Sequence, residues 1–380
     1  MSEYKNKISS LCLENFTVFK KACFDFCPGI NVMIGANGTG KSHVMKVAYS
    51  LVKAINESFE FEISGKDFYA EFMGVEVENS FKEIFRLDKS DYLIRTNQNN
   101  NTDISFNYFE NICNFKILKK SESISSPFVQ YSGGNVTILK NVLNPIFLPA
   151  QEFLSINEGF ISAYNKRELP YDSTFYDLSI ALNDLPLRKK NLDDVWNIIL
   201  LLKSIVAGEP TDIFEDAVFQ RNGRFYVRVS EGSFDVHQVA EGYRKIATLY
   251  YLLRNGSLTK DSILFWDEPE TNLNPKLIVQ LVDVLKRLAA LGMQIFIATH
   301  DYLLSYELSL LAEYPSEPNI DIKFFALHKP ERTAGVEVES GRTLAEIENN
   351  PILEEFAAHY DRESALFHHR EKEEQSNATD

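Results

Sequence analysis

The sequence predicts an α/β fold, and three apolar segments indicate this class. Residues 29–34 form a short, β-branched run that leads into a glycine-rich loop and then a helix-compatible stretch. Residues 262–267 and 294–298 are two further apolar runs of strand length, and an amphipathic helix pattern at 276–291 lies between them. We therefore expect buried strands connected by helices.

Composition limits the kind of protein and its partners. The chain has 380 residues with 44% hydrophobic content, which suits two or so domains or one large domain with an insertion. Its formal net charge of -15 opposes general adhesion to nucleic acid or to an anionic membrane. The polar N-terminus has no apolar run after it, and the most apolar helix candidate, residues 195–206, contains Asn197 and Lys203. We expect a cytoplasmic protein without membrane contact.

The four cysteines predict neither a metal site nor disulfides. Cys12, Cys23, Cys27 and Cys113 lie in or beside apolar stretches, and no nearby histidine completes a zinc-binding spacing. We expect reduced thiols in the core.

The first part of the chain leads to a phosphate-binding loop. Residues 7–13 and 22–26 predict two strands, and residues 29–34 predict a third. The next residues match the pattern G-x-x-x-x-G-K-[ST], and they are Gly35, Ala36, Asn37, Gly38, Thr39, Gly40, Lys41 and Ser42. A helix-compatible run follows from His43 to Asn56. A strand, this loop and a helix in succession predict a nucleotide site.

The residue types of the loop suit a triphosphate. Its glycines let the backbone N–H groups point at phosphate oxygens, and the following helix adds the positive end of its dipole. Lys41 is expected to reach the β- and γ-phosphates, and Ser42 to place its hydroxyl on Mg²⁺. Phe16 or Phe19, in the turn between the first two strands, is a candidate to stack on adenine. The predicted cofactors are ATP and Mg²⁺.

The middle of the chain changes character twice. In residues 57–140 aromatic and β-branched residues alternate with polar ones, which predicts a strand-rich insertion. Residues 154–202 look mainly helical, and the alternating pattern at 214–229 around Asn222-Gly223 predicts a hairpin. The segment 239–245 opens a helix that runs to about Leu253. No sustained heptad pattern occurs, so we expect no long coiled coil.

Acidic residues follow the apolar strand at 262–267. A carboxylate at the carboxyl end of a buried parallel strand can hold Mg²⁺, and the next residue can hold an attacking water. By position, Asp267 takes the first role and Glu268 the second. The strand at 294–298 leads to His300, which is placed to donate a hydrogen bond to a γ-phosphate oxygen.

The C-terminal part of the chain completes the predicted elements. Residues 322–327 and 335–338 predict a closing hairpin, residues 352–369 predict a last helix, and residues 370–380 predict a disordered tail.

Together these motifs resemble the ABC-type ATPase heads of the SMC/RecF superfamily. The resemblance is greatest to shorter, OLD-like ATPases without long arms or a Toprim domain, including ATPase subunits of anti-phage systems such as PARIS and Septu. It implies a P-loop NTPase fold whose parts would be a first core part at 1–56, a strand-rich insertion at 57–140, a helical lobe at 141–238, a second core part at 239–345, and a terminal helix and tail at 346–380.

The resemblance also assigns roles to residues. It implies that Gly35–Ser42 is the Walker A motif, that Ile263–Glu268 is the Walker B motif with Glu268 as catalytic glutamate, and that His300 is the switch histidine. Gln151 would be the Q-loop residue that contacts nucleotide and metal. The set of nucleotide-contacting residues would include the Walker A residues Asn37 and Thr39 and the following His43.

The segment Ala240–Lys245 occupies the place of the Leu-Ser-Gly-Gly-Gln signature but departs from it. Ala240 stands where a serine would touch a γ-phosphate bound to the opposite subunit, and Glu241 replaces a glycine. In the D-loop, residues 270–275, Asn274 stands for the usual aspartate and can still form a hydrogen bond across a dimer. The remaining candidates for phosphate contact are the backbone of Gly242 and the charges of Arg244 and Lys245.

Such heads form a homodimer, or a higher homo-oligomer, with two ATP molecules between the subunits. The implied chemistry is attack of water on the γ-phosphate, with Glu268 acting on the water and Lys41, Mg²⁺ and His300 stabilising developing charge. We expect a sensor or regulatory subunit of an anti-phage or toxin-type system that acts through a separately encoded effector protein. The alternatives are a RecF-like repair ATPase, for which the acidic chain offers no obvious DNA-binding surface, and a nucleotide-gated scaffold with little turnover. The stretch after His300 is too short for the Toprim domain of a nuclease.

Overall fold

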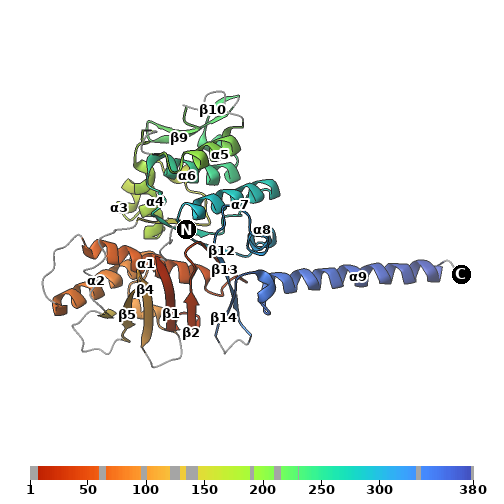
Figure 1. Ribbon diagram of the computed structural model, residues 1–380, viewed down its shortest axis with the longest axis horizontal. Coiled ribbons are helices and arrows are strands. Elements are labelled where there is room, and N and C mark those ends of the chain that lie inside the picture. The colour runs from red at the N-terminus through yellow and green to blue at the C-terminus, as the bar shows by residue number, and fades with distance from the viewer. Residues whose placement is uncertain are drawn as a thin grey trace.

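The structure is a computed structural model that describes residues 7–59, 66–95, 101–119, 129–133, 144–188, 192–208, 215–229, 231–330 and 335–377. In these residues three sheets and the helices around them form the body of the molecule, and the last helix projects from it (Figure 1). Short 3-10 turns occur at Ser90–Leu93, Leu154–Ile156, Val236–Gln238 and Leu344–Glu346.

A six-stranded sheet lies at the centre. In spatial order its strands are β14 (Glu337–Gly341), β13 (Ile322–His328), β3 (Ile30–Gly35), β12 (Gln294–Thr299), β11 (Ile263–Asp267) and β7 (Pro145–Leu148). The five strands from β13 to β7 are parallel, and β14 pairs antiparallel with β13. The predicted buried strands and the closing hairpin are confirmed. Because the strands are parallel, β3, β11 and β12 end at the same edge of the sheet.

A five-stranded antiparallel sheet contains both N-terminal strands. Its order is β2 (Phe19–Asp25), β1 (Ile8–Phe16), β4 (Thr102–Tyr108), β5 (Asn111–Ile117) and β6 (Val129–Gly133). Residues 57–140 contain β4, β5 and β6, in agreement with the predicted strand-rich insertion, although β4 extends the sheet of β1 and Lys66–Phe85 forms a helix, α2. The helical signal lies in Met73, Val77, Phe81 and Ile84, which recur three or four residues apart and are all buried.

A lobe of helices and a small sheet follows β7. It contains α3 (Phe160–Asn165), α4 (Ser173–Asn183), α5 (Trp196–Ala207), β8 (Val218–Arg221), β9 (Arg224–Val229) and β10 (Gly232–Asp235). Asn222 and Gly223 both have positive φ between β8 and β9, so the predicted hairpin turn is confirmed. The chain then enters α6 (Glu241–Asn255), also as predicted.

The central sheet separates two hydrophobic cores. Leu264 and Trp266 of β11 belong to a core shared with α4, α5, α6, α7 (Pro275–Ala290) and α8 (Tyr302–Glu313). Ile263 and Phe265 belong to a second core, shared with α1 (Lys41–Phe59), α2 and the antiparallel sheet. Successive strand residues face opposite sides, so strands covered on both faces are apolar throughout.

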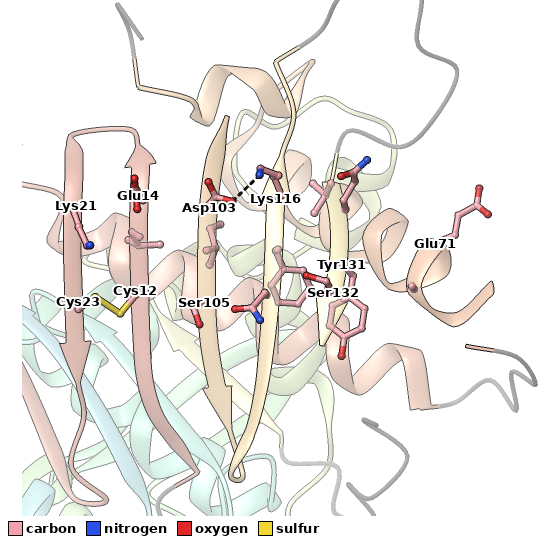
Figure 2. A pocket seen from close by; sticks show the side chains of 17 residues that line it. Cys12, Glu14, Lys21, Cys23, Glu71, Asp103, Ser105, Lys116, Tyr131 and Ser132 are labelled. Carbon is pink, nitrogen blue, oxygen red and sulfur yellow. Dashed lines mark ion pairs between the residues drawn. A yellow bond between two sulfur atoms is a disulfide. The ribbon is translucent and has the colours of Figure 1, made fainter. Parts of the chain in front are cut away.

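The prediction of four reduced cysteines is wrong for two of them. Cys12 and Cys23 form a disulfide between β1 and β2, and Figure 2 shows it on one face of the antiparallel sheet. The antiparallel register places the two residues directly opposite each other, with their Cα atoms 4.1 Å apart. Cys27 and Cys113 are free, and Cys113 is buried.

The last helix is longer than predicted. Helix α9 spans Pro351–Asn377 and extends away from the body (Figure 1). The prediction of disorder from residue 370 is wrong up to residue 377, and residues 378–380 lie outside the described residues. No glycine or proline follows Pro351 in this helix, and its charged residues are mostly good helix formers. Within the described residues, no helix has the length and apolar character needed to cross a membrane.

Candidate functional site

The phosphate loop connects β3 to α1 at the carboxyl edge of the central sheet. Gly40 has φ +94°, and a Cβ atom there would lie 2.7 Å from both Val18 and Phe19. Gly35 has φ +154°, and its Cβ atom would lie 2.5 Å from the carbonyl oxygen of Leu327. Both positions therefore require glycine, and the loop is wedged between β13 and the turn that joins β1 to β2.

Lys41 lies inside this loop. Its side chain is buried, and Nζ donates hydrogen bonds to the carbonyl oxygens of Gly35 (2.6 Å) and Ala36 (3.1 Å). Burial lowers the pKa of Lys41, and the nearby carboxylates of Glu268 and Asp267 oppose that shift. Phosphate oxygens offer the same ammonium stronger acceptors than the two carbonyls do.

Ser42 and Asp267 bring oxygen donors together from two elements. Ser42 lies in the first turn of α1, and its hydroxyl lies beside the Asp267 carboxylate at the end of β11. Burial raises the pKa of Asp267, and the neighbouring Ser42 hydroxyl opposes this shift. A hydroxyl and a carboxylate fit a Mg²⁺ ion whose other ligands are phosphates and water. Among the described residues, no group of three or more His, Cys, Asp or Glu side chains is placed to hold a metal ion.

Glu268 and His300 meet beside the loop. Oε1 of Glu268 lies 3.2 Å from Nδ1 of His300, and both side chains are partly exposed. Glu268 has φ +44°, a left-handed conformation that is uncommon for a residue other than glycine. Its N–H donates to the carbonyl oxygen of Ala298 on β12 (2.8 Å), which ties the turn to the strand before His300. The turn presents the Glu268 carboxylate to solvent near His300.

The expectation that Phe16 or Phe19 stacks on adenine is wrong. Both side chains have 0% exposure and pack in the core below the antiparallel sheet, because they flank a two-residue turn with their rings on its buried side. The turn residue Thr17 instead approaches the loop helix, with Oγ1 3.1 Å from Nδ1 of His43. The His43 ring also makes an edge contact with Phe85 of α2. Sequence reasoning missed Thr17 because turn residues show no periodic pattern.

In the segment expected to form the Q-loop, Gln151 is exposed and Glu152 is buried. Gln151 is exposed, and Nε2 donates to the hydroxyl oxygen of Tyr171 at 3.4 Å. Glu152 is buried, accepts a hydrogen bond from the Ser155 hydroxyl (2.6 Å), and lies 3.2 Å from Nε of Arg244. Arg244, expected to supply charge to a nucleotide, is thus paired within its own chain. No local pattern in the sequence indicates the contact between Glu152 and Arg244.

The signature and D-loop residues also contact each other within the chain. Ala240 is the N-cap of α6 and forms no side-chain cap, whereas Asn274 caps α7 by accepting from the N–H of Leu277 at 3.0 Å. Gly242 is packed so closely that an added Cβ would lie 2.6 Å from the carbonyl oxygen of Asn272. Lys245 is buried, and Nζ donates to the carbonyl oxygen of Glu268 at 3.1 Å.

Comparison with known families agrees with this arrangement. Residues 30–305 match the family model described as "AAA domain, putative AbiEii toxin, Type IV TA system". The chain belongs to this family. No curated protein matches the sequence. The predicted α/β P-loop ATPase fold, with a helical lobe and with no long coiled coil in the described residues, is confirmed.

Solved structures that match this AAA-domain family member include SMC heads. One is the SMC head domain from Thermotoga maritima, with TM-score 0.47, 10% identity, and coverage of 88% of this chain and 98% of that one. A second is the Smc head bound to the C-terminal winged-helix domain of ScpA, with TM-score 0.48, 14% identity, and coverage of 89% and 98%. A third is the Smc head with an extended coiled coil bound to the C-terminal domain of ScpA, derived from Pyrococcus furiosus, with TM-score 0.46, 14% identity, and coverage of 92% and 99%.

In this member of the AAA-domain family, the strand ends bring Lys41, Ser42, Asp267, Glu268 and His300 to one place.

Of the other predicted residues, Asn37 and Gly38 are exposed in the phosphate loop, and the Thr39 hydroxyl donates to the Ala36 carbonyl oxygen at 2.9 Å. Gln151 and Ala240 are exposed, and Glu241 is the acidic residue in the first turn of α6.

A further buried acid near the site is Glu270. Glu270 is buried, and its Oε1 accepts from the Thr299 hydroxyl at 2.6 Å. Burial raises the pKa of Glu270. In the sequence, Thr299 at the end of β12 is the residue that could indicate this contact, because its hydroxyl can reach the turn that follows the neighbouring strand β11.

Proposed function

We propose that this protein is an ATPase that binds ATP and Mg²⁺ at the phosphate loop and pairs with a second copy around the nucleotide. The observation that carries the proposal is the convergence of the Lys41 ammonium, the Ser42–Asp267 pair and the Glu268–His300 pair at one sheet edge. These groups supply a cation for phosphate, oxygen ligands for Mg²⁺, and a base beside an imidazole.

The proposed chemistry is hydrolysis of the γ-phosphate. Lys41 exchanges its carbonyl acceptors for phosphate oxygens and holds the triphosphate against the loop N–H groups. Ser42 and Asp267 would hold Mg²⁺, which would supply positive charge beside the phosphates. Glu268 orients the attacking water and accepts its proton, and His300, 3.2 Å from Glu268, stabilises charge on the γ-phosphate.

Pairing would use the N-terminus of α6, where the N-cap Ala240 and the first-turn residue Tyr243 are exposed. Its free backbone N–H groups and dipole suit a phosphate on the second copy. Ala240 contributes no hydroxyl, and Arg244 is held by Glu152, so the backbone supplies most of this contact. We therefore expect ATP-dependent dimers that dissociate readily.

We further propose that the ATP state regulates a separately encoded effector protein in an anti-phage or toxin-type system. Two features support a protein partner. The family description refers to a toxin system. In addition, α9 projects from the body (Figure 1). Its exposed apolar side chains are Leu353, Phe356, Tyr360, Leu366 and Phe367. Single exposed apolar residues are common, but five on one projecting helix favour contact with another protein.

The test is co-purification of the product of the adjacent gene with wild type and with Glu268→Gln, which is expected to hold ATP longer. Different yields of the adjacent product with the two forms are the expected result. Tight binding of duplex DNA at moderate salt, together with no protein partner, would replace this proposal by the repair-type function.

A further inference from the structure

The main chain of Glu268 is held by hydrogen bonds at both its N–H and its carbonyl oxygen. Its N–H donates to the carbonyl oxygen of Ala298, and its carbonyl oxygen accepts from the N–H of Thr271 at 3.2 Å and from Nζ of Lys245 at 3.1 Å. A residue with a side chain keeps a φ of +44° only where its surroundings fix that conformation. These three hydrogen bonds fix the main chain of Glu268, and the Thr271 hydroxyl also donates to Oε2 of its carboxylate at 3.4 Å.

Lys245 differs from the other two partners because it reaches the turn from another element. It lies in the second turn of α6, and its side chain is only 4% exposed. Within the described part of the chain, the Glu268 carbonyl is the hydrogen-bond acceptor that the structure gives Nζ. Burial lowers the pKa of Lys245, while four acids oppose this shift, namely Glu270, Glu241, Glu268 and Asp267. A buried ammonium is stable only where such partners surround it.

Helix α6 touches the same turn at a second point. Gly242 packs against Asn272, where an added Cβ would lie 2.6 Å from the carbonyl oxygen. Asn272 also has a positive φ, of 64°. One face of α6 therefore contacts both ends of the segment 268–272, through Lys245 and through Gly242. Any displacement of α6 is transmitted to this segment, because close-packed groups have no space in which to move independently.

We propose that Lys245 is a positioning residue for hydrolysis, which holds the turn that presents the Glu268 carboxylate and links its placement to α6 of the same chain. This role presupposes the ATPase activity proposed above. It differs from the contact expected from the sequence, in which Lys245 would supply charge to a nucleotide on the opposite subunit. A side chain that is 4% exposed and directed at the Glu268 carbonyl is poorly placed for that contact.

The test compares Lys245→Met with wild type. Methionine fills similar space but removes the ammonium, so the turn loses one of its three fixing hydrogen bonds. A misplacement of about 1 Å at a reacting group can cost about 100-fold in rate. We expect kcat for ATP to fall by about tenfold or more, with the KM for ATP and the affinity for a fluorescent ATP analogue nearly unchanged. Lys245→Arg, which keeps a charged donor, is expected to recover much of kcat.

Lys7→Met is the matched control. Lys7 is also buried, and its Nζ donates to main-chain carbonyl oxygens of Ser262 (3.0 Å) and Gly292 (3.0 Å), next to the opposite end of β11. The control removes a buried lysine and its carbonyl contacts away from the site. Both methionine variants are expected to melt earlier than wild type, but only Lys245→Met is expected to lose kcat beyond the loss of folded protein.

A double variant separates positioning from other roles. If Lys245 acts through Glu268, adding Lys245→Met to Glu268→Gln should change single-turnover hydrolysis by less than about twofold. The proposal would be overturned if the losses of hydrolysis rate in the double variant were additive. It would also be overturned by a kcat for Lys245→Met equal to that of wild type or of Lys7→Met, or by a selective loss of ATP-dependent pairing. Should Lys245→Met fail to fold, a comparison of kcat between Lys245→Arg and Lys245→Gln tests the same proposal. Wild-type turnover no higher than that of Lys41→Ala would instead contradict the ATPase function itself.

Discussion

Replacing Asp177 with alanine should loosen the attachment of the helical lobe to the phosphate-loop helix. Asp177, on α4, accepts a hydrogen bond from the hydroxyl of Tyr49 on α1 (2.8 Å). It also pairs with Nζ of Lys53 on α1 at 2.7 Å. Tyr49 is almost fully buried, whereas Lys53 and Asp177 are 18% and 24% exposed. A further charged contact joins Lys46 of α1 to Asp172, the N-cap of α4.

The size of the effect follows from these contacts. Asp177→Ala leaves the buried Tyr49 hydroxyl without its acceptor, which costs about 1–3 kcal/mol. The partly exposed ion pair with Lys53 adds about 1 kcal/mol or less. With about 2.1 cal/mol/K per residue, the unfolding entropy of 380 residues is about 0.8 kcal/mol/K. A loss of about 1–4 kcal/mol therefore lowers Tm by about 1–5 °C.

Asp103→Ala provides the control. Asp103 pairs with Lys116 on the open face of the antiparallel sheet at 3.4 Å, and the two side chains are 56% and 45% exposed (Figure 2). Such a pair contributes little, so we expect a Tm change of about 1 °C or less. Thermal unfolding followed by circular dichroism measures both variants. Equal shifts for Asp177→Ala and Asp103→Ala would refute the argument that the buried hydroxyl makes the difference.

Three further predictions concern the nucleotide site. Lys41→Ala should abolish ATP binding in a fluorescence titration, because the triphosphate loses its principal cation, and unchanged affinity would remove the loop from the site. Asp267→Asn should weaken ATP binding only when Mg²⁺ is present, and an equal loss in excess EDTA would contradict a metal role. His300→Ala should lower kcat by about tenfold or more with little change in ATP affinity, and a selective rise in the dissociation constant would point to ground-state binding instead.

The parts of the fold that the sequence predicts well are those with a local pattern. The strands β3, β11 and β12 are continuous apolar runs, and the loop after β3 has a fixed motif, so the strands and the loop follow from the sequence. The hairpin at Asn222-Gly223 follows from the φ angles that its turn requires. Helix α2 was missed because its β-branched and aromatic residues also fit a strand pattern locally.

The features that depend on register or on distant contacts could not be predicted. The Cys12–Cys23 disulfide requires the pairing of β1 with β2 residue by residue. The contact between Lys245 and the Glu268 carbonyl depends on how α6 packs beside the end of β11. A charged residue at the start of a helix usually faces solvent, so sequence alone favoured an outward role for Lys245.

The most direct test of the central claim is phosphate release by Glu268→Gln beside wild type at saturating ATP and Mg²⁺. The glutamine fills the same space and cannot accept the proton of the attacking water, while Lys41, Ser42 and Asp267 still hold the nucleotide. We predict turnover by wild type, a fall of about 100-fold or more in the variant, and equal or tighter binding of ATP by the variant. Turnover by Glu268→Gln at the wild-type rate would contradict the proposed mechanism.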